Sequence, residues 1–212
     1  MDMKEREKVL VLDFGGQYNQ LIARRVRDLN VYCDLKNCDM TMEEIKEYNP
    51  IGIIFTGGPN SVYEESSPHV SPEIFKLGIP VLGICYGCQL IAYTLGGTVT
   101  HAETSEYGKR EIRVLKENLL FKGVPETSVS WMSHTDYVTE LPEGFRIIGK
   151  TPTCPAAAIE CEAKGFYGVQ FHPEVNHTPK GSALIKNFLF EVCGCKGDWT
   201  MTNYIEDQIK KI

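Results

Sequence analysis

Two cysteines lie three residues apart in the segment GICYGCQL, residues 83 to 90. Cys85 follows the apolar run PVLGI, and Cys88 opens a segment with a helical pattern. Three chemistries fit such a pair: a redox couple, half of a metal site, or one nucleophile beside an unreactive neighbour. The flanking residues and the rest of the chain distinguish them.

The glycines around Cys85 favour the nucleophile. Gly83 and Gly87 stand two residues before and two residues after it, which is the Gly-x-nucleophile-x-Gly pattern of a sharp strand-to-helix turn, with cysteine in place of serine. Such a turn points the middle side chain out at the carboxyl edge of a sheet, and the N-terminus of the following helix favours a thiolate over a thiol. We therefore predict that Cys85 is a nucleophile.

The redox and metal interpretations explain less of the sequence. A thioredoxin-type pair also lies at a strand-to-helix step, but it does not require both glycines. A zinc site needs two more ligands at matching spacing, and the remaining cysteines do not offer a matching pair. We predict no metal, and we predict that Cys88 packs in the core as a small apolar residue. A reversible disulfide between Cys85 and Cys88 under oxidants is a further hypothesis.

The segment YGVQFHPEV supplies a base and a group that can orient it. His172 follows an apolar strand pattern, Pro173 ends strand pairing, and Glu174 stands two residues beyond the histidine. Because residues two apart point to the same side of an extended chain, Glu174 can bond one imidazole nitrogen while the other faces a thiol. A thiol nucleophile needs this base and this orienting group. The sequence thus predicts a Cys85–His172–Glu174 triad.

Acyl transfer also needs N–H donors for a developing oxyanion. The backbone N–H of Tyr86, the first after the nucleophile, is one candidate. The second is the N–H of Gly58 in FTGGPNS, a turn in which a side chain would block access. The same glycines could merely end a strand, but the two strand ends are expected to be neighbours in the sheet.

Strand and helix patterns alternate through the first half of the chain. This alternation predicts an α/β fold: a mostly parallel open sheet flanked by helices. From residue 98 the pattern becomes β-rich with short turns, which predicts antiparallel additions to the sheet, and a helix follows at 181–193. The expected strands of the first half are 8–16, 31–38, 50–61 and 79–87, and the expected helices are 17–30, 41–49 (with a capping box from Thr41 and Glu44), 71–78 and 88–97.

Composition excludes several classes of protein. The chain has 212 residues, a formal charge of −6 and a pI near 5.4, so a sequence-independent hold on nucleic acid is not expected. The basic residues Arg24, Arg25 and Arg27 fall in a helical pattern that we expect to be a solvated face. The N-terminus is no signal peptide, and no apolar run reaches the roughly 18 residues of a membrane span. We expect a cytoplasmic protein whose eight cysteines are mostly reduced.

In this order, the segments FTGGPNS, GICYGCQL and FHPEV resemble the class I (triad-type) glutamine amidotransferases, which have a flavodoxin-like fold. The resemblance implies that Cys85 attacks the side-chain amide of L-glutamine and forms a thioester while ammonia leaves, and that water then releases glutamate. It also implies that the substrate is held by Gln89, Ser133, His134, Thr135 and Asp136. Cys88 and Thr135 stand where most relatives have methionine and glycine, so Cys88 adds a second thiol beside the nucleophile and Thr135 adds a side chain near the ligand.

Within this family, the segments VLDFGGQYNQLIARRVRDLN, SEYG, WMSHTD and GCKGDWTM are most similar to glutaminases joined, normally on one chain, to an ATP-pyrophosphatase (synthetase) domain. That domain uses the ammonia to convert XMP to GMP in purine biosynthesis, and the complete enzyme can be a homodimer. The resemblance implies no cofactor for the present chain, and ATP and Mg2+ for the synthetase domain. The Ser-Gly-Gly-x-Asp-Ser loop of such a domain does not occur in this sequence.

We accordingly expect a glutaminase domain over residues 1–195 and, over 196–212, a linker and terminal helix leading toward the absent ATP-pyrophosphatase domain. Trp199 in this tail is expected to be exposed. Docking of the terminal helix back onto this domain, and a free-standing glutaminase subunit, are the alternatives. For the whole chain, the other interpretations are an amidotransferase of the anthranilate or carbamoyl-phosphate type, a γ-glutamyl peptidase, and a flavodoxin-like binding module without catalysis.

Overall fold

The computed structural model describes residues 6–115 and 117–210. The strands are β1 (Lys8–Asp13), β2 (Tyr32–Asn37), β3 (Gly52–Phe55), β4 (Val81–Ile84), β5 (Thr98–Val114), β6 (Thr127–Glu140), β7 (Arg146–Lys150), β8 (Ala158–Cys161) and β9 (Phe166–Val169). The helices are α1 (Asn19–Asp28), α2 (Met42–Tyr48), α3 (Tyr86–Thr94), α4 (Gly181–Asn187) and α5 (Met201–Ile209), with short 3-10 helices at Pro72–Lys76 and Glu162–Lys164 and a π-helical turn at Phe188–Val192.

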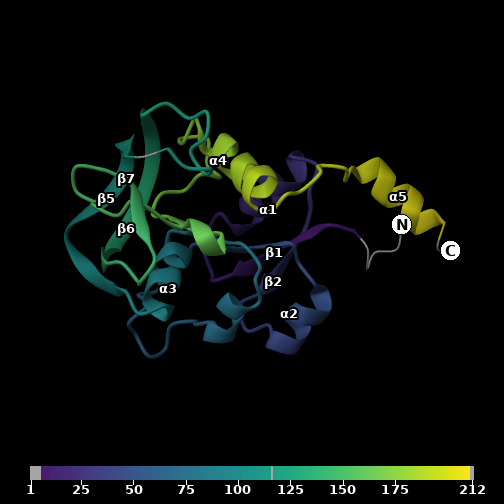
Figure 1. Ribbon diagram of the computed structural model, residues 1–212, viewed down its shortest axis with the longest axis horizontal. Coiled ribbons are helices and arrows are strands. Elements are labelled where there is room, and N and C mark those ends of the chain that lie inside the picture. Colours follow the sequence, from purple (N-terminus) through teal and green to yellow (C-terminus); the bar gives the residue numbers. More distant parts are fainter. Residues whose placement is uncertain (1–5, 116, 211–212) are drawn as a thin grey trace.

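Within the described residues, nine strands form one sheet in the order β2-β1-β3-β4-β9-β8-β7-β5-β6. The pairs from β2 to β9 are parallel, and the pairs from β9 to β6 are antiparallel. Helices α1 and α4 cover one face of the parallel part, and α2 and α3 cover the other (Figure 1). The predicted parallel sheet with helices on both faces and antiparallel additions is confirmed.

Each parallel strand is apolar on both faces because its side chains pack into two hydrophobic cores, one on each side of the sheet. Along β1, Val9 and Val11 pack in the core with α1 and α4, while Leu10 and Leu12 pack in the core with α2 and α3. All four side chains are fully buried, and each contributes about 1.5–3 kcal/mol on transfer from water. The two cores hold the strand ends, and hence the loops that carry the predicted chemistry, in a fixed arrangement.

Two predicted helices differ from the structure. Over 71–78 the chain forms only the 3-10 helix Pro72–Lys76, because Gly78 adopts a positive φ of 73° and ends the turn. The helix expected at 88–97 begins two residues earlier, at Tyr86, because Cys85 itself is the cap residue. The capping box predicted for α2 is present.

Cys85 occupies the strand-to-helix turn that its glycines predict. Its φ of 54° and ψ of −108° lie outside the regions that L residues prefer, a strain that costs about 1–3 kcal/mol and recurs at active sites. A Cβ at Gly83 would lie 2.4 Å from the carbonyl oxygen of Gly87, and a Cβ at Gly87 would lie 2.4 Å from the carbonyl oxygen of Phe55. The turn therefore needs both glycines because backbone approaches backbone at each.

A methyl group at this turn is expected to destabilise the fold. Gly87→Ala should lower the free energy of unfolding by about 1–3 kcal/mol, because the new Cβ meets the backbone of β3 rather than a flexible side chain. Urea unfolding followed by circular dichroism measures the change. Gly78→Asn is the matched control, since no atom lies within 4 Å of its Cβ position and asparagine tolerates positive φ. Equal stability of the two variants would contradict the close approach.

The tail beyond residue 195 packs back on the sheet before α5 begins. The backbone N–H of Trp199 donates to the carbonyl of Asn30 at 2.9 Å, and the indole lies against the ring of Tyr32. Trp199 is only 7% exposed, so the expectation of an exposed tryptophan is wrong: the edge strand β2 offers it an aromatic partner. Of the predicted tail segment 196–212, residues 211 and 212 lie outside the described residues.

Helix α5 extends beside the N-terminal part of the chain, away from the helices that cover the sheet (Figure 1). Asp207 pairs with Arg6. Met201, Ile205 and Ile209 are exposed, so the apolar stripe of α5 is not buried by the described part of this chain.

Candidate active site

A cavity of about 280 Å3 opens at the carboxyl edge of the parallel strands, where open α/β sheets bind ligands. The loops after β1, β3 and β9, the turn into α3, and the middle of β6 line it. The structure brings every predicted site residue to this cavity: Gly58, Cys85, Tyr86, Gln89, Ser133, His134, Thr135, Asp136, His172 and Glu174. Their roles in catalysis and binding stay predictions.

The three predicted triad residues are in contact. His172 Nδ1 lies 2.7 Å from Glu174 Oε1, and the imidazole lies close enough to Cys85 for the two side chains to interact electrostatically. The imidazole and the Cβ of Cys85 both lie within 4 Å of the Cβ position of Gly57, so glycine leaves room for their approach. The edge of the Tyr18 ring packs against the imidazole, with the ring centroids 5.6 Å apart.

The surroundings of His172 favour its protonated form. Burial by itself lowers the pKa of His172, but hydrogen bonds and charge interactions with Cys85 and Glu174 outweigh burial and raise the pKa from 6.5 to about 10. A protonated imidazole beside the sulfur stabilises a thiolate, which is the nucleophilic form of cysteine. The arrangement therefore places a protonated imidazole, with Glu174 on its other side, where it would stabilise negative charge on the sulfur.

The two predicted oxyanion donors flank the nucleophile. Tyr86 is the first residue of α3, where a helix leaves its N–H groups without helical partners. Gly58 lies at the end of the neighbouring strand, and a Cβ there would lie 2.4 Å from the carbonyl oxygen of Phe14. Both residues line the cavity, as an oxyanion hole requires. The position of an oxyanion between their N–H groups stays a prediction.

Cys88 is fully buried, which confirms the prediction that it packs in the core. Its Sγ lies 2.6 Å from the position that a Cβ at Gly168 of β9 would occupy. Burial raises the pKa of the Cys88 thiol well above its usual value. A buried thiol that rarely ionises reacts slowly in disulfide exchange, which weakens the hypothesis of a rapid Cys85–Cys88 switch.

Not every predicted substrate residue has its polar atoms free for a ligand. The carboxylate of Asp136 accepts hydrogen bonds from Ser61 and Tyr63, at 3.0 Å for the tyrosine hydroxyl, and lies 3.2 Å from His101 Nδ1. An α-ammonium group of a substrate would have to share or replace these partners. The carbonyl oxygen of Ser133 lies 3.7 Å from Cys85 Sγ and can accept a hydrogen bond only while that sulfur carries a proton.

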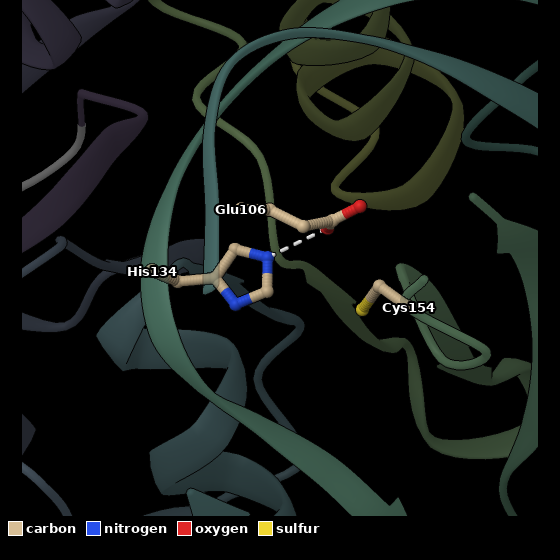
Figure 2. Close-up of side chains that lie close together, drawn as sticks. All are labelled: Glu106, His134 and Cys154. Carbon is tan, nitrogen blue, oxygen red and sulfur yellow. Dashed lines mark hydrogen bonds and ion pairs between the residues drawn. The ribbon is translucent and has the colours of Figure 1, made fainter. Parts of the chain in front are cut away.

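His134 lies in a buried ion pair rather than facing a ligand (Figure 2). Its Nδ1 lies 2.9 Å from the carbonyl oxygen of Asp136, and its Nε2 lies 2.8 Å from Glu106 Oε2. Burial would raise the pKa of Glu106, but hydrogen bonds from His134, Thr153 and Thr151 lower it to about 2. Both ring nitrogens thus lie at hydrogen-bond distance from oxygens inside the fold.

Cys154 lies next to this ion pair, which makes Glu106, His134 and Cys154 the one group of three metal-ligating side chains close together among the described residues (Figure 2). Burial raises the pKa of the Cys154 thiol to about 12. The oxygens of Glu106 already accept from Thr151, Thr153 and His134. A metal would have to replace this satisfied network and take the proton from the buried Cys154 thiol, so the group is better explained as hydrogen-bonded side chains that fix strand β6.

Three residues that the sequence analysis did not assign to the active site support it. Arg25 Nε donates to the carbonyl of Glu174 at 3.0 Å, so the expectation that Arg25 belongs to a solvated face is wrong. Thr178 donates to the carbonyl of His172 at 2.7 Å and accepts from the N–H of Trp131 at 2.9 Å. Gln170, fully buried, approaches the sulfur of Cys85. The sequence signal that could have identified Gln170 is its position two residues before His172.

The Thr178 hydroxyl connects the turn that carries His172 to β6, so its loss is expected to slow the reaction. Thr178→Val should lower kcat by about tenfold to a hundredfold, because two hydrogen bonds of about 1 kcal/mol each are lost in a buried place. Thr178→Ser keeps the hydroxyl and should retain most of the activity. Assays of glutamate release from glutamine measure both. Equal rates for the two variants would show that the hydroxyl does not position His172.

Comparison with known proteins agrees with the fold. The family model described as "Glutamine amidotransferase class-I" matches residues 10–192. The chain belongs to the class I glutamine amidotransferase family. Among curated relatives, proteins described as "GMP synthase [glutamine-hydrolyzing]" from Clostridium novyi (strain NT) and Clostridium botulinum (strain Alaska E43 / Type E3) are 60% and 56% identical to it over 208 residues.

These alignments cover 98% of this chain but only 41% and 40% of the two relatives, so the chain spans about two fifths of their length. Among solved structures, a protein from Thermoplasma acidophilum that is provisionally described as part of a GMP synthase has a TM-score of 0.78 and 27% identity, and the match covers 96% of this chain and 98% of the other. A glutamine amidotransferase from Thermotoga maritima has a TM-score of 0.73 at 19% identity, covers 90% and 100% of the two chains, and supports the fold alone.

Proposed function

We propose that this chain is the glutaminase part of a GMP synthase, and that it hydrolyses L-glutamine to glutamate and ammonia at Cys85. The single observation that carries the proposal is the contact of Cys85, His172 and Glu174 at a strained strand-to-helix turn beside a cavity. A binding module without catalysis would have no need of a strained cysteine paired with an imidazolium.

The reaction follows from the groups at the cavity. The Cys85 thiolate attacks the amide carbon of glutamine, and the N–H groups of Gly58 and Tyr86 stabilise the oxyanion that forms. His172 gives its proton to the leaving nitrogen, the carbon–nitrogen bond breaks, and ammonia leaves a γ-glutamyl thioester. His172, now neutral, takes a proton from water as the water attacks the thioester. The carbon–sulfur bond breaks, glutamate departs, and the thiolate–imidazolium pair is restored.

The GMP synthase assignment rests on the relatives that share 55–60% identity with nearly the whole chain. We propose that the ammonia passes to an ATP-pyrophosphatase (synthetase) domain, normally on the same chain, which uses ATP and Mg2+ to convert XMP to GMP in the cytoplasm. The glutaminase part itself would need no cofactor. Among the described residues, no helix has the length and apolar character needed to cross a membrane.

The proposed hydrolysis can be tested with the 212-residue chain and four substrate conditions: L-glutamine, L-asparagine, a γ-glutamyl dipeptide and no substrate. We expect glutamate and ammonia in equal amounts from glutamine, and no release from asparagine, which is one methylene shorter. Preferred cleavage of the dipeptide would favour a γ-glutamyl peptidase. Adding a synthetase domain with ATP, Mg2+ and XMP should raise glutamate release and yield GMP. Absence of GMP would overturn the assignment to GMP synthase while leaving the glutaminase activity in place.

A further inference from the structure

Gln170 follows β9 directly, and its side chain is fully buried between the nucleophile and α3. Its Nε2 lies 3.6 Å from Cys85 Sγ, within the range of a hydrogen bond to sulfur. Its Oε1 lies 3.1 Å from Gln89 Nε2. The triad described above leaves this contact with the reacting sulfur without a role.

The orientation of the Gln170 amide follows from its neighbours. Gln89 Nε2 lies 2.9 Å from the carbonyl oxygen of Asp136, which can only accept, so this atom of Gln89 must be the donor nitrogen. The second proton of that nitrogen points to Gln170, whose facing atom must then be the acceptor Oε1. The Gln170 N–H2 group is left facing the sulfur of Cys85. Three consecutive contacts thus fix a hydrogen-bond donor at the nucleophile.

We propose that Gln170 is a further catalytic residue, whose side-chain N–H donates to Cys85 Sγ and stabilises the sulfur whenever it is negatively charged. The sulfur is negative twice in the proposed glutaminase cycle, on which this inference rests: before it attacks the amide, and when it leaves the thioester. A donor at the sulfur increases the fraction of thiolate available for attack and stabilises the sulfur as it leaves the thioester; both effects offset the lower nucleophilicity of a hydrogen-bonded thiolate.

The donor is held by a network that reaches strand β5. The carbonyl of Asp136 accepts from Gln89 and also from His134 Nδ1, and His134 is fixed in turn by Glu106. Every residue of this hydrogen-bond network is buried, and its hydrogen-bond partners lie inside the protein. The amide of Gln170 therefore cannot rotate without breaking hydrogen bonds of the network. His134, which the resemblance implied as a substrate contact, therefore helps to position the donor for the nucleophile.

The test compares Gln170→Met and Gln170→Glu with the parent chain. Methionine keeps the length of the side chain and removes the donor, whereas glutamate keeps the acceptor for Gln89 and places an oxygen at the sulfur. The rate of Cys85 alkylation by iodoacetamide is measured from pH 4 to pH 10, with Cys85→Ala variants to subtract the other thiols. The titratable groups near the sulfur are His172 and Glu174 after β9, Asp136, His134 and Glu106 on β6 and β5, and the buried Cys88 and Cys154.

We expect the acid midpoint of alkylation to move upward by about one pH unit in Gln170→Met, the size expected for one hydrogen bond to a charged group, and further in Gln170→Glu. At pH values below both midpoints alkylation should be about tenfold slower than in the parent chain, and above them the rates should converge. The KM for glutamine should stay within about twofold in Gln170→Met, while kcat falls. An unchanged midpoint in both folded variants, with changes only in thermal stability or KM, would show a structural role and overturn the proposal.

A measurement on the parent chain keeps the inference testable if the variants do not fold. The side-chain N–H2 signals of Gln170 in a 15N-labelled sample should shift with pH at the midpoint found by alkylation, and should be insensitive to pH in Cys85→Ala. Signals of Gln170 that do not titrate in the parent chain would overturn the proposal. Neither readout requires turnover, so a failure here is distinguishable from a failure of the glutaminase proposal, which the release of glutamate tests.

Discussion

Replacing Cys85 with alanine should abolish glutamate release, lowering kcat by at least about ten-thousandfold, because the bond between sulfur and the amide carbon cannot form. The fold should persist, since the residue is small and its strained φ of 54° is no worse for alanine. Release of glutamate is measured with an enzyme-coupled assay. An electrophilic glutamine analogue, followed by mass spectrometry of the digested chain, should label the parent chain at Cys85 alone and leave Cys85→Ala unlabelled.

The other thiols provide the control for this prediction. Cys38→Ala removes a half-buried cysteine that does not line the cavity, and it should retain labelling and activity. Cys85→Ser keeps a weak nucleophile in the same place and should bind glutamine while turning it over very slowly. Labelling of Cys85→Ala by the analogue at the parent rate would show that another residue is the nucleophile. Slow glutamate release by the parent chain would not show this, because the label identifies the nucleophile independently of the rate.

The elements that carry the nucleophile were predictable because local rules decide them. A buried strand followed by Gly-x-Cys-x-Gly has one low-energy way to enter a helix, and the structure confirms the close backbone contacts at Gly83 and Gly87. His172 and Glu174 also meet as predicted, but they do so in a turn after β9, which ends at Val169, and not along an extended strand. Local spacing and strand order were enough to bring the triad together.

The network around the triad could not be predicted because it depends on strand pairing far along the chain. Glu106 faces His134 only because β5 and β6 shift register between His101 and Glu106. The resemblance suggested that His134 holds the substrate, but the structure shows both of its nitrogens bonded inside the fold. A sequence motif identifies which side chains gather at a site, whereas the register decides which of them keep free polar atoms for a ligand.

The same reasoning explains the basic residues of α1. Helical spacing predicted a solvated face for them, yet Arg25 donates to the carbonyl of Glu174, and Arg27 donates to the carbonyl of Cys33 at 2.8 Å. Long cationic side chains can reach main-chain carbonyls at the edge of a core that no periodicity reports. Through the hydrogen bond from Arg25, α1 therefore helps to fix the turn that carries Glu174.

Removing the charge of Glu174 tests the electrostatic part of the site. Glu174→Gln keeps the shape of the side chain but removes the negative charge that, with Cys85, raises the pKa of His172 to about 10. The pKa of His172 should fall, the thiolate–imidazolium pair should lose its proton at a lower pH, and kcat at neutral pH should drop by about a hundredfold to ten-thousandfold. The pH–rate profile, taken with rates of glutamate release, measures both effects. Glu47→Gln, on the exposed face of α2, is the control and should change neither.

The same change has a signature in stability. Because the pKa of His172 in the folded chain lies above the ordinary value of 6.5, its protonation stabilises the fold fully below about pH 6.5, and the stabilisation is lost as the pH rises through 10. Chemical unfolding of the parent chain should therefore show a decline in stability between these values, and in Glu174→Gln the decline should end at a lower pH. If the variant kept both the parent pH–rate profile and this decline, Glu174 would not be the group that holds the proton on His172.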